Sequence, residues 1–269
     1  MPSATLAGKV ALITGGSKGI GRATALRLAN EGANVVINYS SDASAADEVV
    51  NLIGADRSLA VKADAGNIAE LERLVNETVT KFGKIDILIP NAGVLLMKDL
   101  ETTTEHDFEM SMALNVKGPY FLAQVSCCPS RRLLESMENL LTITQKAAPH
   151  MAPGSHIIFF STTLCAASTV TPNYLLYVTT KGAVEQMTRV MSKDLARKGI
   201  SVNAVAPGPT GTDLFFKGKS EQVLKMIAGF NPQNRIGTPE EIADVVAFLS
   251  GDGSKWITGQ IVRVNGGMA

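Results

Sequence analysis

The chain has few cysteines, no excess of either charge and no long apolar run, and each absence excludes a class of protein. Its three cysteines are Cys127, Cys128 and Cys165. An odd number with an adjacent pair does not describe a disulfide framework, and no Cys-x-x-Cys pair indicates a metal site. The cysteine pattern therefore favours a reducing compartment and predicts no metal.

Charge is balanced, with 25 basic and 25 acidic residues, so neither nucleic acid nor a basic partner is indicated. No apolar run approaches the roughly 18 residues that span a membrane. The first seven residues lack the basic start and apolar core of a signal peptide. We therefore expect a cytoplasmic protein that does not bind membranes. At 269 residues, without repeats, the chain suits one large domain.

The most informative stretch is a glycine-rich turn between a strand and a helix. Val10–Ile13 is a short apolar run typical of a buried parallel strand, and residues 22–30 have a helical pattern. Between them the spacing is Thr-Gly-x-x-x-Gly-x-Gly. Glycines let backbone N–H groups approach a pyrophosphate, and the helix N-terminus adds partial positive charge. The stretch therefore predicts a dinucleotide site.

Further strands and helices alternate along the chain, which predicts an α/β fold with a doubly wound, seven-stranded parallel sheet. We expect the other strands at Ala33–Tyr39, Ser58–Ala63, Lys84–Ile89, Ser155–Phe160, Lys198–Val205 and Gln260–Val264. We expect the other helices at Ala43–Leu52, Ile68–Phe82, Glu105–Gln124, Asn173–Met187 and Pro239–Leu249.

The end of the second strand predicts which dinucleotide is bound. An acidic residue there accepts the 2′-OH of NAD, whereas neutral or basic groups leave room for a 2′-phosphate. Tyr39, Ser40 and Ser41 are neutral, and Lys18 in the glycine turn can supply charge, although a lone loop lysine is more often simply solvated. Asp42 is expected past the strand, as a turn residue. The sequence favours NADP over NAD.

Small and polar residues follow the third and fourth strands. Asp64, beside Ala65, can bind an adenine amine or cap the helix at 68–82, and the two roles are compatible. Asn91 can bond the backbone of neighbouring strands. Ala92 and Gly93 are small enough for a cofactor to lie against the strand end.

The helix at 105–124, expected to bend at Gly118-Pro119, carries Asn115 among apolar neighbours. A buried Asn needs partners, so Asn115 is either a satisfied core amide or a member of a proton relay. The apolar residues of Leu214–Phe230 suit a mobile substrate lid, with a peripheral pair of core helices as the alternative.

The fifth strand ends in the hydroxyls of Ser161 and Thr162, and Tyr177 and Lys181 lie four apart on one face of the next helix. With the glycine turn, Asn91-Ala-Gly93, Asn115 and Pro207-Gly208, this order of motifs resembles the short-chain dehydrogenase/reductase family. The resemblance covers nearly the whole chain, and NADP-dependent ketoreductases of the 3-oxoacyl-carrier-protein and hydroxynaphthalene reductase type are most similar.

The resemblance implies a single Rossmann-like domain, a small carbonyl or alcohol substrate, and a homodimer or homotetramer. Tyr177 would be the general acid, with Lys181 lowering the pKa of the phenol and binding the nicotinamide ribose. Asn115 would hold a relay water, and Thr162 would steady the carbonyl oxygen, with Ser161 as the alternative. The cofactor-binding residues that we expect are Gly15, Ser17, Lys18, Ile20, Gly21, Tyr39, Ser40, Ser41, Asp64, Ala65, Asn91, Ala92, Gly93, Tyr177, Lys181, Pro207, Gly208, Thr210 and Thr212.

Three functions are compatible with these motifs. The first is NADP-dependent hydride transfer between the nicotinamide and a ketone or secondary alcohol. The second is reduction of 3-oxoacyl groups on an acyl-carrier protein, for which the sequence shows no clear basic docking patch. The third is a non-catalytic NADP-binding sensor or scaffold, which would not require Tyr177, Lys181 and Asn115.

Residues Val125–Gln145 depart from the family pattern. Without them Gln124 continues into Lys146 as one helix, whereas Pro129 would interrupt that helix. The 21 residues correspond to 63 nucleotides, and Val125-Ser126 and Gln145 can be encoded by splice donor and acceptor triplets. We interpret the segment as a translated, retained intron. The alternative is a genuine insertion, since its leucines follow the spacing of an amphipathic helix.

Overall fold

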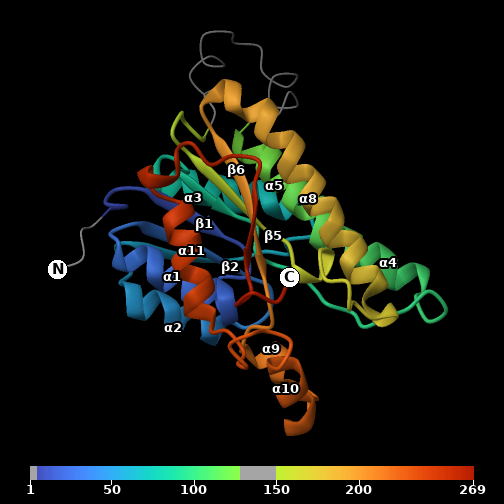
Figure 1. Cartoon of the computed structure of the whole chain (residues 1–269). Coiled ribbons are helices and arrows are strands. Elements are labelled where there is room, and N and C mark those ends of the chain that lie inside the picture. Colours follow the sequence, from blue (N-terminus) through green and yellow to red (C-terminus); the bar gives the residue numbers. More distant parts are fainter. Residues whose placement is uncertain (1–4, 128–149) are drawn as a thin grey trace.

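The computed structural model describes residues 5–127 and 150–269, and these form the predicted doubly wound domain (Figure 1). One sheet holds seven parallel strands in the order β3-β2-β1-β4-β5-β6-β7. The strands are β1 (Val10–Ile13), β2 (Asn34–Tyr39), β3 (Ser58–Lys62), β4 (Ile87–Ile89), β5 (His156–Phe160), β6 (Ser201–Pro207) and β7 (Ile261–Val264).

Helices connect the strands. The α-helices are α1 (Gly19–Asn30), α2 (Ala43–Ile53), α3 (Ile68–Phe82), α4 (Glu105–Met112), α5 (Gly118–Cys127), α8 (Leu175–Leu195), α9 (Asp213–Phe216), α10 (Glu221–Ala228) and α11 (Pro239–Leu249). A π-helix occupies Ala113–Lys117, and single 3-10 turns occupy Thr163–Cys165, Pro172–Tyr174, Ala196–Lys198 and Asp252–Ser254.

Helices cover both faces of the sheet, so most strand residues are apolar (Figure 1). Alternate strand residues face opposite layers. On β1, Ile13 packs in the cluster that includes α1, α2 and α11, whereas Leu12 packs in the cluster that includes α3, α5 and α8. The sheet is thereby fixed between two layers of helices.

The order of the strands reverses beside β1, whose two neighbours are β2 and β4. The connections after β1 and β4 therefore leave in opposite directions, and a crevice opens at the carboxyl ends of these strands. Ligands of doubly wound sheets bind at such a crevice. The glycine turn follows β1 and Asn91 follows β4, so the fold brings the sequence motifs to this edge.

The helix predicted at 105–124 is interrupted by the π-helix Ala113–Lys117, which ends directly before Gly118. Gly118 has a different role. A Cβ atom at this residue would lie 2.1 Å from the carbonyl oxygen of Ala65, so glycine lets α5 approach the end of β3 closely.

The segment at 214–230 folds as the short helices α9 and α10, which project from the body of the molecule (Figure 1). None of the eight described residues of α10 is buried. The alternative of a peripheral pair of core helices is therefore wrong for α10, and the substrate lid remains a prediction.

Residues Val125–Cys127 complete α5, and the rest of the predicted insertion, 128–145, lies outside the described residues. Among the helices that the structure describes, none is both long and apolar enough to cross a membrane.

Candidate active site

The backbone of the glycine turn after β1 lies so close to neighbouring atoms that side chains do not fit there. Gly15 has a φ of +63°, which L-residues with a side chain rarely adopt. A Cβ atom at Gly16 would lie 2.7 Å from Ile37, and one at Gly21 would lie 2.2 Å from the carbonyl oxygen of Gly15. The turn therefore exposes backbone at the crevice, as a phosphate cradle requires.

The N-terminus of α1 is suited to an anion. Within the described residues, Lys18 gives this helix no side-chain cap, and its first turn contains no acidic residue. By contrast, α3 is capped by the Asn67 side chain and carries Glu70 in its first turn. An uncapped N-terminus keeps its N–H groups and partial positive charge for a ligand, so the residues present fit a dinucleotide pyrophosphate.

Two asparagines hold the turn in place. Asn91 Nδ2 donates to the carbonyl oxygens of Thr14 and Gly15, at 2.9 and 3.1 Å. Asn38 accepts from the Gly15 N–H at 3.3 Å and donates to the Ala63 carbonyl at 2.7 Å. The prediction that Asn91 bonds the backbone of neighbouring strands is confirmed, and Asn38 is a support that the sequence did not reveal.

Other predicted cofactor residues lie around this turn. Ser17 is buried, and Ile20 lies in the first turn of α1 and packs partly against the core. At the end of β2, Tyr39 is half-buried and Ser40 and Ser41 are exposed.

Asp42 is not a simple turn residue. Its Oδ1 caps α2 by accepting from the Ala45 N–H at 3.0 Å, and its Oδ2 lies 2.5 Å from Lys18 Nζ. The cation expected to supply charge for a 2′-phosphate is therefore already paired with a carboxylate.

Asp64 does not cap α3, because Asn67 does so by accepting from the N–H groups of Ala69 and Glu70. The Asp64 carboxylate instead accepts from the Gly66 N–H at 2.8 Å and is exposed beside the crevice. Ala65, next to it, is buried against Gly118. The capping role is wrong, and binding of an adenine amine remains a prediction.

Tyr177 is half-buried on α8, and the Thr162 hydroxyl lies close to its phenol. Burial raises the pKa of Tyr177 to about 12, although the Thr162 hydroxyl acts in the opposite direction. Burial sets the direction of this shift and Thr162 is the group that acts against it, so the expectation that Lys181 lowers this pKa stays a prediction. The phenol therefore holds its proton at neutral pH.

Lys181 lies one turn after Tyr177 and is only 6% exposed. Its Nζ donates to the Phe160 carbonyl at 2.8 Å and lies 5.7 Å from the centre of the Tyr177 ring. Burial lowers the pKa of Lys181 to about 8. A Cβ atom at Gly93 would lie 3.6 Å from this ammonium and 3.1 Å from Asn115 Oδ1, so Gly93 keeps the space in front of Lys181 open.

Asn115 sits in the π-helix and is a satisfied core amide. Its Nδ2 donates to the Val94 carbonyl at 2.9 Å and to Thr180 Oγ1 at 3.0 Å, while its Oδ1 accepts from the Val94 N–H at 2.8 Å. Thr180 in turn donates to the Tyr177 carbonyl at 2.7 Å. The structure thus links Asn115 to the tyrosine helix, and π-helical turns are frequent at functional sites.

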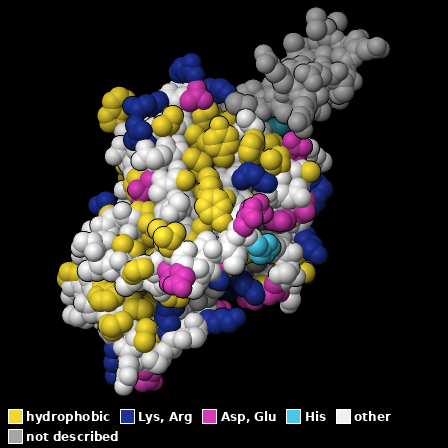
Figure 2. Space-filling view, turned by 90° about the vertical axis from the view of Figure 1, so that its right-hand side faces the viewer, with side chains coloured by type: hydrophobic (Ala, Val, Ile, Leu, Met, Phe, Trp, Pro, Cys, Tyr) yellow, Lys and Arg dark blue, Asp and Glu magenta, His cyan; other side chains and the backbone are white. Residues whose placement is uncertain are grey.

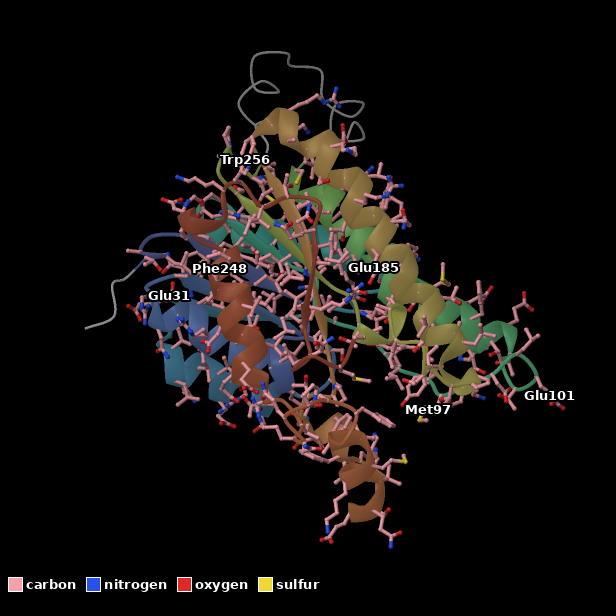
Figure 3. All side chains as sticks on the ribbon, in the orientation of Figure 1. Glu31, Met97, Glu101, Glu185, Phe248 and Trp256 are labelled. Carbon is pink, nitrogen blue, oxygen red and sulfur yellow. The ribbon has the colours of Figure 1, made fainter. Side chains whose placement is uncertain are left out.

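Three consecutive residues at the end of β5 each hold one residue of α8. Phe160 accepts from Lys181, and Thr162 lies close to the Tyr177 phenol. Between them Ser161 Oγ donates to Glu185 Oε1 at 2.8 Å. Figure 3 shows Glu185 on the side of α8 that faces the sheet. Sequence reasoning missed Glu185, although its position four residues after Lys181 puts it on the same helix face.

These contacts separate the two candidate hydroxyls. Ser161 is turned toward Glu185, whereas Thr162 is turned toward Tyr177. The arrangement supports Thr162 as the hydroxyl next to the reacting group.

The loop after β6 begins with Gly208, since Pro207 is the last residue of the strand. Thr210 is buried and donates to the Gly208 carbonyl at 2.9 Å. Thr212 caps α9 by accepting from the Phe215 N–H at 3.1 Å, and its methyl group would lie 3.1 Å from a Cβ atom at Gly19. Thr212 therefore lies against the glycine turn, whereas Thr210 supports the loop.

Comparison with known proteins identifies the family. A family profile described as short chain dehydrogenase matches residues 9–129, and one described as Enoyl-(Acyl carrier protein) reductase matches residues 131–269. A hydroxynaphthalene reductase-like protein of Metarhizium anisopliae is 36% identical over 277 residues, which cover 98% of this chain and 96% of that protein. The chain belongs to the short-chain dehydrogenase family. A short chain dehydrogenase of Passalora fulva is similar to the same extent, 36% over 277 residues, with 98% and 96% covered.

Solved structures agree with this assignment. A short-chain dehydrogenase/reductase of Serratia marcescens is 33% identical with a TM-score of 0.84, and covers 98% of this chain and 99% of its own. A short chain dehydrogenase of Burkholderia cenocepacia, solved in complex with NADP, is 30% identical with the same TM-score and coverage. The short-chain dehydrogenase described here is therefore an oxidoreductase that acts on CH–OH groups with a nicotinamide cofactor.

Proposed function

We propose that this short-chain dehydrogenase transfers a hydride between NADPH and a ketone, or between NADP and the corresponding secondary alcohol. The observation that carries the proposal is the placement of the Tyr177 phenol between the Thr162 hydroxyl and the Lys181 side chain, at the sheet edge that carries the glycine turn.

Each residue of the site has a separate role in the proposed reaction. Tyr177 protonates the carbonyl oxygen, and the pKa of about 12 keeps that proton available at neutral pH. Thr162 donates a hydrogen bond to the same oxygen. The nicotinamide supplies or accepts the hydride when it is bound. Lys181 holds its ribose, and Asn115, whose side chain is already satisfied, offers only its main-chain carbonyl to a relay water.

NADP is proposed as the preferred cofactor. The residues at the end of β2 are neutral, and Lys18 is close to them. One similar structure, a blue fluorescent protein from a metagenomic library that is 32% identical, with a TM-score of 0.84 and with 98% of this chain and 99% of its own covered, is in complex with NADPH. Calorimetric titration tests this: NADPH should bind more tightly than NADH, and Lys18→Glu should weaken NADPH far more. Equal affinities in the parent would contradict the preference.

The substrate test is a panel of carbonyl compounds followed by NADPH absorbance. It should contain hydroxylated aromatic ketones, because a relative is named hydroxynaphthalene reductase-like, aliphatic ketones and a 3-oxoacyl thioester. Turnover of free ketones supports the proposal. Turnover confined to the thioester on its carrier protein would support the acyl-carrier alternative, and cofactor binding without any turnover would support a sensor or scaffold.

The proposed assembly is a homodimer or homotetramer in the cytoplasm. A groove of about 520 Å³ crosses α4, the π-helix and α5, and is lined by Phe108, Met112, Tyr120 and Phe121 among others. Figure 2 shows hydrophobic side chains gathered on this side of the molecule. Exposed apolar surface of this kind marks protein contacts. Light scattering tests the assembly, and a monomer would contradict it.

A further inference from the structure

We propose that Asp42 is a specificity-determining residue that holds Lys18 and competes with the 2′-phosphate of NADP for its charge. The preference for NADP over NAD is then smaller than Lys18 alone would give, and removing the Asp42 charge increases it. This inference rests on the proposed function, because it assumes that NADP binds at the glycine turn.

The Asp42 carboxylate is held from two sides. Oδ2 lies 2.5 Å from Lys18 Nζ, and Oδ1 accepts from the Ala45 N–H at the start of α2 at 3.0 Å. The pair raises the pKa of Lys18 and lowers the pKa of Asp42, so both groups are charged at neutral pH. The side chains are 62% and 41% exposed, so a ligand can reach them.

Other charged residues lie near the Lys18–Asp42 pair. Asp213, at the start of α9, adds a second negative charge that faces Lys18. Arg22, one turn further along α1, is itself paired with Glu48 of α2 at 2.7 Å. Figure 1 shows α1 and α2 side by side. Both cations at the start of α1 are therefore matched by acidic residues of the neighbouring helix.

NADP and NAD differ in how they interact with the Lys18–Asp42 pair. A phosphate monoester carries close to two negative charges at neutral pH, so at the end of β2 it must draw Lys18 from Asp42 and then remain beside that carboxylate. The ribose 2′-OH of NAD is neutral, so NAD does not have to draw Lys18 from Asp42 and places no negative charge beside that carboxylate. The Asp42 charge therefore opposes NADP and leaves NAD nearly unaffected. Since an exposed pair is weak and screened by salt, the effect is about fivefold.

The test is Asp42→Asn, because Asn is also a good N-cap and keeps α2 in place. Isothermal titration of NADP and NAD should show that this variant binds NADP about fivefold more tightly, while NAD changes by less than about twofold. The gain should shrink as salt is added. The matched control is Asp47→Asn, which removes the same charge from an exposed position on α2 and should change neither affinity.

A second variant shows whether the effect passes through Lys18. In a Lys18→Met background, Asp42→Asn should tighten NADP less than it does in the parent, because the competition for the ammonium is gone. Unchanged NADP binding in Asp42→Asn would overturn the inference while leaving the proposed function intact. Weaker NAD binding would also overturn it, since Asp42 would then accept the ribose hydroxyl. A parent that binds neither dinucleotide would overturn both proposals.

Discussion

At the scale of single residues, burial governs the two titratable groups of the site in opposite directions. It raises the pKa of Tyr177 to about 12 and lowers the pKa of Lys181 to about 8. The charged form is disfavoured in each case, because both groups lie away from water. A neutral phenol is the form that can protonate a carbonyl oxygen.

The buried ammonium gives a prediction about stability and pH. The folded pKa of Lys181 lies below its unfolded value, so between about pH 8 and pH 10.5 the unfolded chain binds more protons and stability rises with pH. Lys181→Met removes this contribution. Between pH 7 and pH 10 the parent should gain about 1 to 2 kcal/mol relative to the variant, measured by urea unfolding. Parallel curves would contradict the assignment of a buried, charged Lys181.

The two hydroxyls at the end of β5 give the second prediction. Thr162→Ala should lower kcat about 100-fold, because it removes a donor from the reacting oxygen. Thr162→Ser should restore most of this rate. Ser161→Ala removes the bonds of this hydroxyl to Glu185 and Cys165 and should cost much less. If the kinetic losses are reversed, Ser161 is the hydroxyl that contacts substrate.

At the scale of secondary-structure elements, local signals predicted some boundaries well. The bounds of β1, α3 and α11 agree with the sequence, because apolar runs end at strong signals: Asn67 caps α3, left-handed Gly83 ends it, and Thr238 forms a capping box with Glu241. Tertiary contacts decided the rest. β4 begins at Ile87, later than the apolar run predicts, and the Asp86 carboxylate accepts from the Val10 N–H and pairs with Lys84.

In the candidate site, too, local patterns predicted some features and tertiary contacts decided the others. The residues themselves could be named from motifs, since spacing along one helix or turn puts them on one face. The Lys18–Asp42 pair, the Ser161–Glu185 bond and the raised pKa of Tyr177 could not, because each depends on groups brought together from different elements.

The contact between β5 and α8 gives a prediction at this scale. We expect Glu185 to be a positioning residue that keeps α8 in register with the end of β5. Glu185→Ala should lower kcat about three- to tenfold with the KM for cofactor unchanged, as expected for one lost hydrogen bond. Glu185→Gln keeps an acceptor and should rescue the rate.

A double-mutant cycle tests the register directly. Ser161→Ala combined with Glu185→Ala should lower kcat no more than either change alone, because both remove the same bond. Additive losses, or no rescue by Gln, would show that Glu185 does not act through Ser161.

At the scale of the whole molecule, the open question is the segment at Val125–Gln145. We predict that the chain without these residues is more stable and more active than the full chain, because Gln124 then continues directly into Lys146. Thermal unfolding, light scattering and NADPH turnover of the two chains, prepared in parallel, check this. A shortened chain that misfolds or loses turnover would show that the segment is a genuine part of the protein.

The central claim is that Tyr177 supplies the proton in a reaction for which the glycine turn and Lys181 hold the cofactor. The most direct measurement compares turnover and NADPH affinity in Tyr177→Phe. We predict that kcat falls at least about 100-fold, since the acid is removed, while the dissociation constant of NADPH stays within about twofold because the ribose and phosphate contacts remain. Turnover close to that of the parent would contradict the account.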